Sequence, residues 1–151
     1  LVGPTARVSV QFGAAASEEI QVPVVEFQPG IFASGSFGIV VRSADNTLVT
    51  EARPGRGNEL VYFYATGLGP VTNAPTTGAA SPSGPLAEVR NTPEVRLGAD
   101  RCEVLFAGLA PGFVGIYQVN VRLPASVLPG LANLTISAGG STSREVRVPV
   151  Q

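Results

Sequence analysis

The sequence contains no histidine, tryptophan, methionine or lysine, and it has one cysteine, Cys102. Without histidine, there can be no Ser-His or Cys-His pair for nucleophilic catalysis and no histidine-based zinc site. Without lysine, no isopeptide bond can form through a side-chain amine, because all ten basic residues are arginines. Any assembly is therefore predicted to be non-covalent or to pass through Cys102.

Charge and long apolar runs are also scarce. The net charge is -1, only 14% of the residues are charged, and the arginines form no basic cluster. A nucleic-acid backbone or an anionic membrane surface is therefore not an expected partner. No apolar run approaches the roughly 18 residues of a membrane span, and no leader signature is present, so we expect no membrane insertion.

The eleven acidic residues do not fall into a recognisable catalytic or metal-binding signature. Asp45, Asn46 and Asp100 could offer oxygen ligands to calcium, but ordinary turn formation by Asp and Asn explains them better. We therefore predict no catalytic residue, no cofactor and no metal, and we expect the chain not to be an enzyme. A lone Cys102 is either buried as a small apolar residue or available for an intermolecular bond, and burial is favoured.

Apolar residues recur with a period of two along most of the chain, which predicts an all-β fold. In residues 59–66 both faces are apolar or aromatic, which predicts a central strand with Tyr62 and Tyr64 in the core. Turn signals at intervals of about ten residues favour an antiparallel β-sandwich. The predicted strands are residues 6–12, 18–26, 36–42, 47–51, 59–66, 94–98, 102–107, 115–123, 131–138 and 143–150.

Residues 67–93 are rich in Pro, Gly, Ser and Thr and contain few large apolar residues. This composition favours a mobile crossover between the two sheets. A binding loop is the alternative, because long loops without secondary structure are often functional.

An internal repeat divides the chain. Residues 7–24 align without a gap on residues 133–150, a constant offset of 126, with identities such as Gly13/Gly139, Ser17/Ser143 and Pro23/Pro149. Two copies of one hairpin indicate the end of one β-domain followed by a whole second one. We therefore predict an N-terminal hairpin in residues 1–24, which is the tail of a preceding domain or a set of assembly strands, and a complete domain in residues 25–151.

The first copy is predicted to present an apolar face without a domain of its own beneath it. Strand addition to a neighbouring molecule would satisfy both its backbone and this face. Packing on its own domain is the alternative. The expected partners are copies of the chain or neighbouring domains of the same protein. The residues predicted to form this assembly interface are Val8, Val10, Ile20, Val22 and Val24.

Three segments carry a family resemblance: Pro29–Phe32, Tyr64–Pro70 and Phe106–Val121. In order and spacing they resemble the uncharacterised C-terminal domain found on many secreted proteins of Solibacter-type acidobacteria. The resemblance implies an immunoglobulin-like antiparallel β-sandwich, with the N-terminal hairpin as an addition. It also implies export to the cell surface or the medium, and it supplies no catalytic residues.

The function expected from residues and resemblance together is a non-catalytic extracellular structural module. It is expected to self-assemble into surface filaments by strand addition through the N-terminal hairpin. The alternative is a carbohydrate- or protein-binding accessory module of a larger secreted protein, in which aromatic side chains stack on the ligand.

Overall fold

The structure is a computed structural model that describes residues 4–151, and these residues form strands and no helix. The predicted all-β class is confirmed. The first three residues of the predicted segment 1–24 lie outside the described residues. The strands are β1 (Thr5–Val8), β2 (Gln11–Phe12), β3 (Ala15–Ala16), β4 (Ile20–Pro23), β5 (Gly30–Ile31), β6 (Ala33–Ser34), β7 (Phe37–Gly38), β8 (Val40–Arg42), β9 (Leu60–Thr66), β10 (Glu94–Leu97), β11 (Asp100–Leu109), β12 (Tyr117–Arg122), β13 (Gly130–Ala138), β14 (Ser141–Thr142) and β15 (Val146–Val150).

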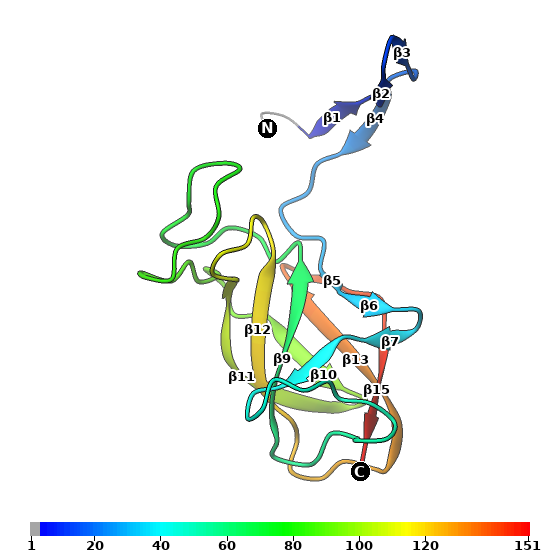
Figure 1. Cartoon of the computed structure of the whole chain (residues 1–151), viewed down its shortest axis with the longest axis vertical. Helices are drawn as coiled ribbons and strands as arrows, with labels where there is room; N and C mark the ends of the chain where they lie inside the picture. Colours follow the sequence, from blue (N-terminus) through cyan, green and yellow to red (C-terminus); the bar gives the residue numbers. More distant parts are fainter. Residues whose placement is uncertain (1–3) are drawn as a thin grey trace.

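One large sheet forms the body of the molecule, which we define as residues 25–151 (Figure 1). Its strand order is β5-β9-β12-β11-β10-β13-β15-β7-β6, with β8 also paired to β9 and β14 to β13. Because β5 and β6 are neighbours in the chain but lie at opposite ends of this order, the sheet nearly closes like a barrel. The expectation of a purely antiparallel sheet is wrong at one pair, β15 with β7, which runs parallel. A two-residue strand such as β7 carries no periodic signal in the sequence that could reveal its direction.

Strand β11 joins two halves of the sheet, one that continues through β12 and β9 and one that continues through β10 and β13, because it changes partners along its length. Residues 100–102 pair with β10, and residues 103–109 pair with β12. The register with β12 shifts between Val104 and Phe106, which marks a β-bulge. A bulge bends a strand and increases its twist, so β11 can serve both halves of the sheet around one core.

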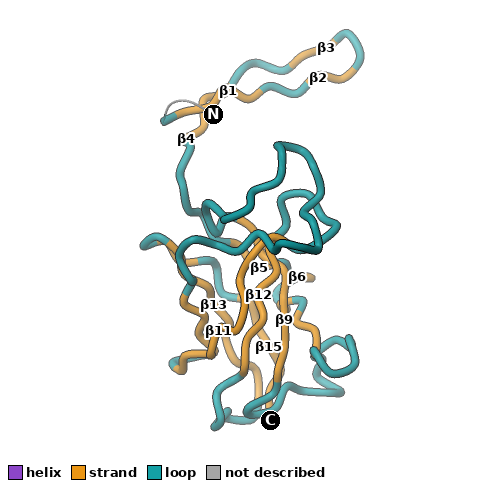
Figure 2. The backbone as a smooth tube through the Cα atoms, turned by 90° about the vertical axis from the view of Figure 1, so that its left-hand side faces the viewer, coloured by secondary structure: helices purple, strands orange, loops and turns teal. Residues whose placement is uncertain are grey.

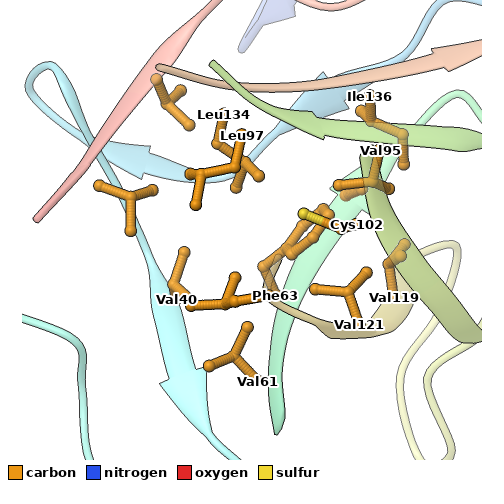
Figure 3. Close-up of a cluster of buried hydrophobic side chains, with 14 of the residues drawn as sticks. Val40, Val61, Phe63, Val95, Leu97, Cys102, Val119, Val121, Leu134 and Ile136 are labelled. Carbon is orange, nitrogen blue, oxygen red and sulfur yellow. The ribbon is translucent and has the colours of Figure 1, made fainter. Parts of the chain in front are cut away.

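The core lies inside the curved sheet (Figure 3). Phe63 of β9 is completely buried, and Leu134 and Ile136 of β13 are buried in the same cluster. Cys102 also lies in this cluster, so its predicted burial is confirmed. Burial raises the pKa of the Cys102 thiol to about 12, with a smaller contribution from the nearby Asp100 carboxylate.

Residues 67–93 connect β9 to β10, as expected of a crossover, and they are hydrogen-bonded to one another and to β11. The Thr72 N–H donates to the Glu88 carbonyl at 2.8 Å, and the Leu109 N–H of β11 donates to the Ala87 carbonyl at 2.8 Å. Ala87 is fully buried and forms a second small core with Val71 and Leu109. The few apolar residues at the two ends of the segment are therefore enough to hold it against β11.

Candidate interaction surface

The N-terminal hairpin, residues 4–24, extends away from the body in both views (Figures 1 and 2). β1 pairs with β4 and β2 pairs with β3, and within residues 4–151 neither pair is hydrogen-bonded to a strand of the body. Its salt bridge, Arg7 with Glu19 at 3.8 Å, is internal to the hairpin. Because a lone two-stranded hairpin is marginally stable in water, this element is the first candidate for an interaction.

The hairpin repeats the strand pairing at the C-terminal end of the body. In β1 and β4, Val8 lies opposite Ile20, and 126 residues later Leu134 of β13 lies opposite Val146 of β15. The other pairs of β1 and β4 follow with the same offset, and the pairing of β2 with β3 matches that of β13 with β14. The sequence repeat is thus also a repeat of backbone register.

One serine sets the same hydrogen bonds in both hairpins. The Ser17 N–H donates to the Val10 carbonyl, and the Val10 N–H donates to Ser17 Oγ, both at 2.9 Å. Ser143 makes the equivalent bonds with Ile136, at 2.9 and 3.1 Å. Each serine hydroxyl also donates to the carbonyl of the following residue. These bonds join residues close in sequence, so each hairpin sets its register locally.

The two hairpins differ in what covers them. Ile136 is completely buried and Val146 is 7% exposed, whereas their equivalents Val10 and Ile20 are 69% and 60% exposed. In the body, β10 lies beside β13 and β7 lies beside β15. In the described part of the chain, β1 and β4 have no such neighbour. The N-terminal copy therefore has the strand pairing of a terminal hairpin without the burial.

The five residues predicted to form the assembly interface are placed together on this hairpin. The side chains of Val8, Val10 and Ile20 are exposed, and those of Val22 and Val24 are half-buried. Phe12 is not among the predicted residues, but it lies on the same hairpin and its side chain is 89% exposed. Continuing the two-residue alternation from Val8 and Val10 would have included it.

Phe27 covers a position on the C-terminal hairpin that is open on the N-terminal one. A Cβ atom added to Gly139 would lie 2.1 Å from the Phe27 ring, and one added to Gly69 would lie 2.3 Å from it. The equivalent of Gly139 is Gly13, and their φ angles are 55° and 60°. Apart from Gly13 itself and its two chain neighbours, no heavy atom of residues 4–151 lies within 4 Å of the place where a Gly13 Cβ would be. Among the described residues, the aromatic contact of the C-terminal hairpin is thus absent at its repeat.

A second apolar surface lies on the outer face of the sheet, and it corrects a sequence prediction. Tyr62 and Tyr64 were expected in the core, but Val61, Phe63 and Ala65 occupy the inner face of β9 and leave both tyrosines half-buried on the outer face. The ring centroids of Tyr64 and Phe113 are 5.8 Å apart. A hollow of about 130 Å³ is lined by Phe32, Ile39, Tyr64, Phe113 and Ile116.

Two amide side chains lie beside these rings. Gln118 pairs in register with Tyr64, and Asn120 pairs with Tyr62. Gln118 Nε2 donates to Asn120 Oδ1 at 2.8 Å, and both side chains are half-buried. Gln118 therefore lies beside Tyr64, which lines the apolar hollow, so a hydrogen-bonding group neighbours a stacking surface.

Arg42 is the one charged residue that is fully buried among residues 4–151. Its guanidinium pairs with Glu59 at 2.7 Å and donates to the carbonyls of Leu48, Arg53 and Pro54 at 2.7 to 2.9 Å. These partners come from the connection between β8 and β9, so Arg42 holds that connection against β8.

Asp45 belongs to the turn after β8. Hydrogen bonds from the Thr47 hydroxyl and backbone N–H, together with the Arg53 guanidinium, lower the pKa of Asp45 to about 2. The turn role that we expected for this residue is therefore the one that the geometry supports. Among the described residues, no three His, Cys, Asp or Glu side chains are grouped so as to hold a metal ion.

Comparisons of the chain with protein-family models, with curated proteins and with solved structures gave no match. No helix capable of crossing a membrane occurs in residues 4–151. The exposed apolar face of the hairpin is therefore the main feature of the described residues that points to a function.

Proposed function

We propose that the chain is a non-catalytic structural module in which the hairpin of residues 4–24 completes a β-body other than its own. The observation that carries the proposal is the contrast between two hairpins of one register, one buried and one exposed. The resemblance of residues 25–151 to domains of secreted proteins supports an extracellular or cell-surface location. The bent strand β11, which serves two halves of the sheet around one core, supports classing the body as an immunoglobulin-like sandwich.

The energetic reason is the burial that the second hairpin achieves. Leu134, Ile136 and Val148 are each at most 2% exposed. Full burial of such a side chain contributes about 1.5–3 kcal/mol relative to exposure. The equivalents Val8, Val10 and Val22 are also apolar, so the hairpin of residues 4–24 gains comparable stabilisation on a suitable body.

Two arrangements supply such a body. In the first, it is a further domain of the same polypeptide, and the domains follow one another in series. In the second, it belongs to a neighbouring molecule, and the hairpin joins that molecule by strand addition. The second arrangement produces a head-to-tail filament, because the contact joins two different surfaces and does not close.

A graft tests whether residues 4–24 can complete a body. The graft variant carries residues 7–11 in place of 133–137 and residues 17–24 in place of 143–150, and it keeps Ala138 and the Gly139-Gly140 turn. We expect cooperative unfolding, with a loss of roughly 1–3 kcal/mol from the smaller side chains at positions 134 and 136. Far-UV circular dichroism during urea unfolding measures this.

Two control variants define the outcome of the graft. The triple variant L134V/I136V/V146I changes only the apolar positions and is expected to fold. A second graft with serine at positions 136 and 148 is expected to lose cooperative unfolding, because polar groups would be buried there. If the triple variant folds and the first graft does not, residues 4–24 are not a completing hairpin.

Carbohydrate binding is a second candidate function, favoured by the outer-face position of Tyr64 and Phe113 beside Gln118. Aromatic rings stack on the apolar faces of sugars, and amides bond their hydroxyl groups. A glycan array probes this directly. Binding that is lost in Tyr64→Ala and kept in Phe12→Ala, a matched change of an exposed ring on the hairpin, would support the hollow as a sugar site. Absence of binding across the array would remove this candidate.

A further inference from the structure

We infer that the body completed by residues 4–24 is not a second copy of this chain but a related β-body with a benzyl-sized pocket for Phe12 and an apolar side chain that covers Gly13. This inference rests on the proposed function and specifies the partner of the same surface. Four features of the structure lead to it.

First, the matching place on a second copy is already occupied. Residues 130–150 of the body pair with β10 along β13 and with β7 along β15. A foreign hairpin would have to displace a covalently attached one that makes the same backbone bonds. Because the attached hairpin has a high effective concentration, exchange offers no net gain.

Second, the one large difference between the two apolar faces is at Phe12. Its equivalent in the body is Ala138, which is 7% exposed and adjoins Gly139, over which the Phe27 ring packs. A benzyl group in place of the Ala138 methyl would overfill this region, and overpacking strains a core. The body that receives Phe12 must therefore provide space that this body lacks.

Third, the Gly13 turn lacks the contact that its repeat has. In the body, the Phe27 ring lies against Gly139, and no atom occupies the matching place at Gly13. The two glycines share a left-handed backbone conformation, so both leave a side-chain-free surface beside the turn. An apolar group of the partner is the complement of this surface.

Fourth, the body's sheet edges give the hairpin little to pair with. The strands at the ends of the sheet order, β5 and β6, are two residues long, and β8 is three residues long. Short edge strands offer few free backbone groups. Simple edge addition to a second copy would also leave Val10 and Ile20 without a surface to bury them.

The first test compares matched substitutions in the full chain. Ala138→Phe is expected to lower the melting temperature by roughly 5–10 °C, because it introduces the Phe12 side chain into this body. Phe12→Ala is expected to leave the melting temperature unchanged. An Ala138→Phe variant as stable as the unmodified chain would overturn the inference, because this body would then accept the Phe12 ring.

The second test uses the graft described above, with Phe instead of Ala at position 138. We expect the Ala graft to fold and the Phe graft to melt roughly 5–10 °C lower. Equal melting temperatures would overturn the inference while leaving the proposed function intact. Failure of the Ala graft beside a folded L134V/I136V/V146I control would instead overturn the proposed function.

The third test is sedimentation velocity of the unmodified chain over a wide concentration range. A monomer at every concentration supports the inference. Oligomers that disappear in Val10→Asp and persist in Leu128→Asp would overturn it, because they would show copies joining through the hairpin. Leu128 is a suitable control because its side chain is 89% exposed and lies on the body.

Discussion

Truncation to alanine is expected to have very different effects at the two equivalent positions 10 and 136 of the repeat. Ile136→Ala removes a completely buried side chain, and such changes cost about 2–5 kcal/mol through lost burial and the remaining cavity. Val10→Ala acts on a side chain that is 69% exposed, and we expect a change within about 0.5 kcal/mol. The two positions have the same register and the same serine hydrogen bonds, and isoleucine exceeds valine by one methylene group, worth about 0.5–1.5 kcal/mol. The rest of the difference measures burial of the side chain by the surrounding body.

Urea unfolding followed by tyrosine fluorescence and far-UV circular dichroism measures both free energies, since the chain has no tryptophan. For a chain of this size, a loss of 2–5 kcal/mol lowers the melting temperature by roughly 5–20 °C. The reasoning is refuted if Val10→Ala costs more than about 1 kcal/mol, because the hairpin would then be packed on its own body. It is also refuted if Ile136→Ala costs less than about 1 kcal/mol.

Three further predictions concern the body. Arg42→Met is expected to lower the free energy of unfolding by about 3–5 kcal/mol, because it leaves Glu59 and three loop carbonyls without their buried partner. The control Arg53→Met removes an exposed ion pair with Asp45 and is expected to lower it by at most about 1 kcal/mol. Thermal or urea unfolding measures both. The pKa of Asp45 is about 2 in the folded chain and 3.8 ordinarily. Its stabilising effect is therefore complete above about pH 4 and is lost as the pH falls towards 2. Over that interval, the melting temperature of Asp45→Asn should fall less than that of the unmodified chain. Because the pKa of Cys102 is about 12, the native thiol should resist iodoacetamide at about pH 8 and react once the chain is unfolded in urea, as mass spectrometry would show.

Long strands with regular alternation could be predicted from the sequence. The predicted strands at 59–66 and 115–123 correspond to β9 and β12, because apolar residues on one face of each strand supply the core. Gly67 and Gly69 follow the end of β9 with φ angles of 69° and 82°, a left-handed conformation that glycine adopts without strain. The alignment of residues 7–24 with 133–150 predicted two copies of one hairpin, and the two copies have the same register because the same spacing of Gly and Ser produces the same turn.

Features that depend on distant contacts could not be predicted in this way. Strands β5 and β6 are two residues long, too short for any periodicity to appear. The sequence of β9 is apolar on both faces, so it could not show that the Tyr62 and Tyr64 face is left partly open. Likewise, the composition of residues 67–93 did not reveal that Ala87 would be buried against Leu109 of β11, some twenty residues later in the chain.

The repeat separates two properties that usually occur together in a folded hairpin. Register is set locally, because Ser17 and Ser143 make the same short-range bonds whether or not the hairpin is covered. Burial is set by the surrounding body, because Val10 and Ile136 differ in exposure although their backbones are equivalent. A hairpin that already has its register loses less conformational freedom when it binds, so more of the apolar stabilisation remains as affinity. We therefore propose that the exposed face of residues 4–24 is a preorganised docking element and that Phe12 makes it selective.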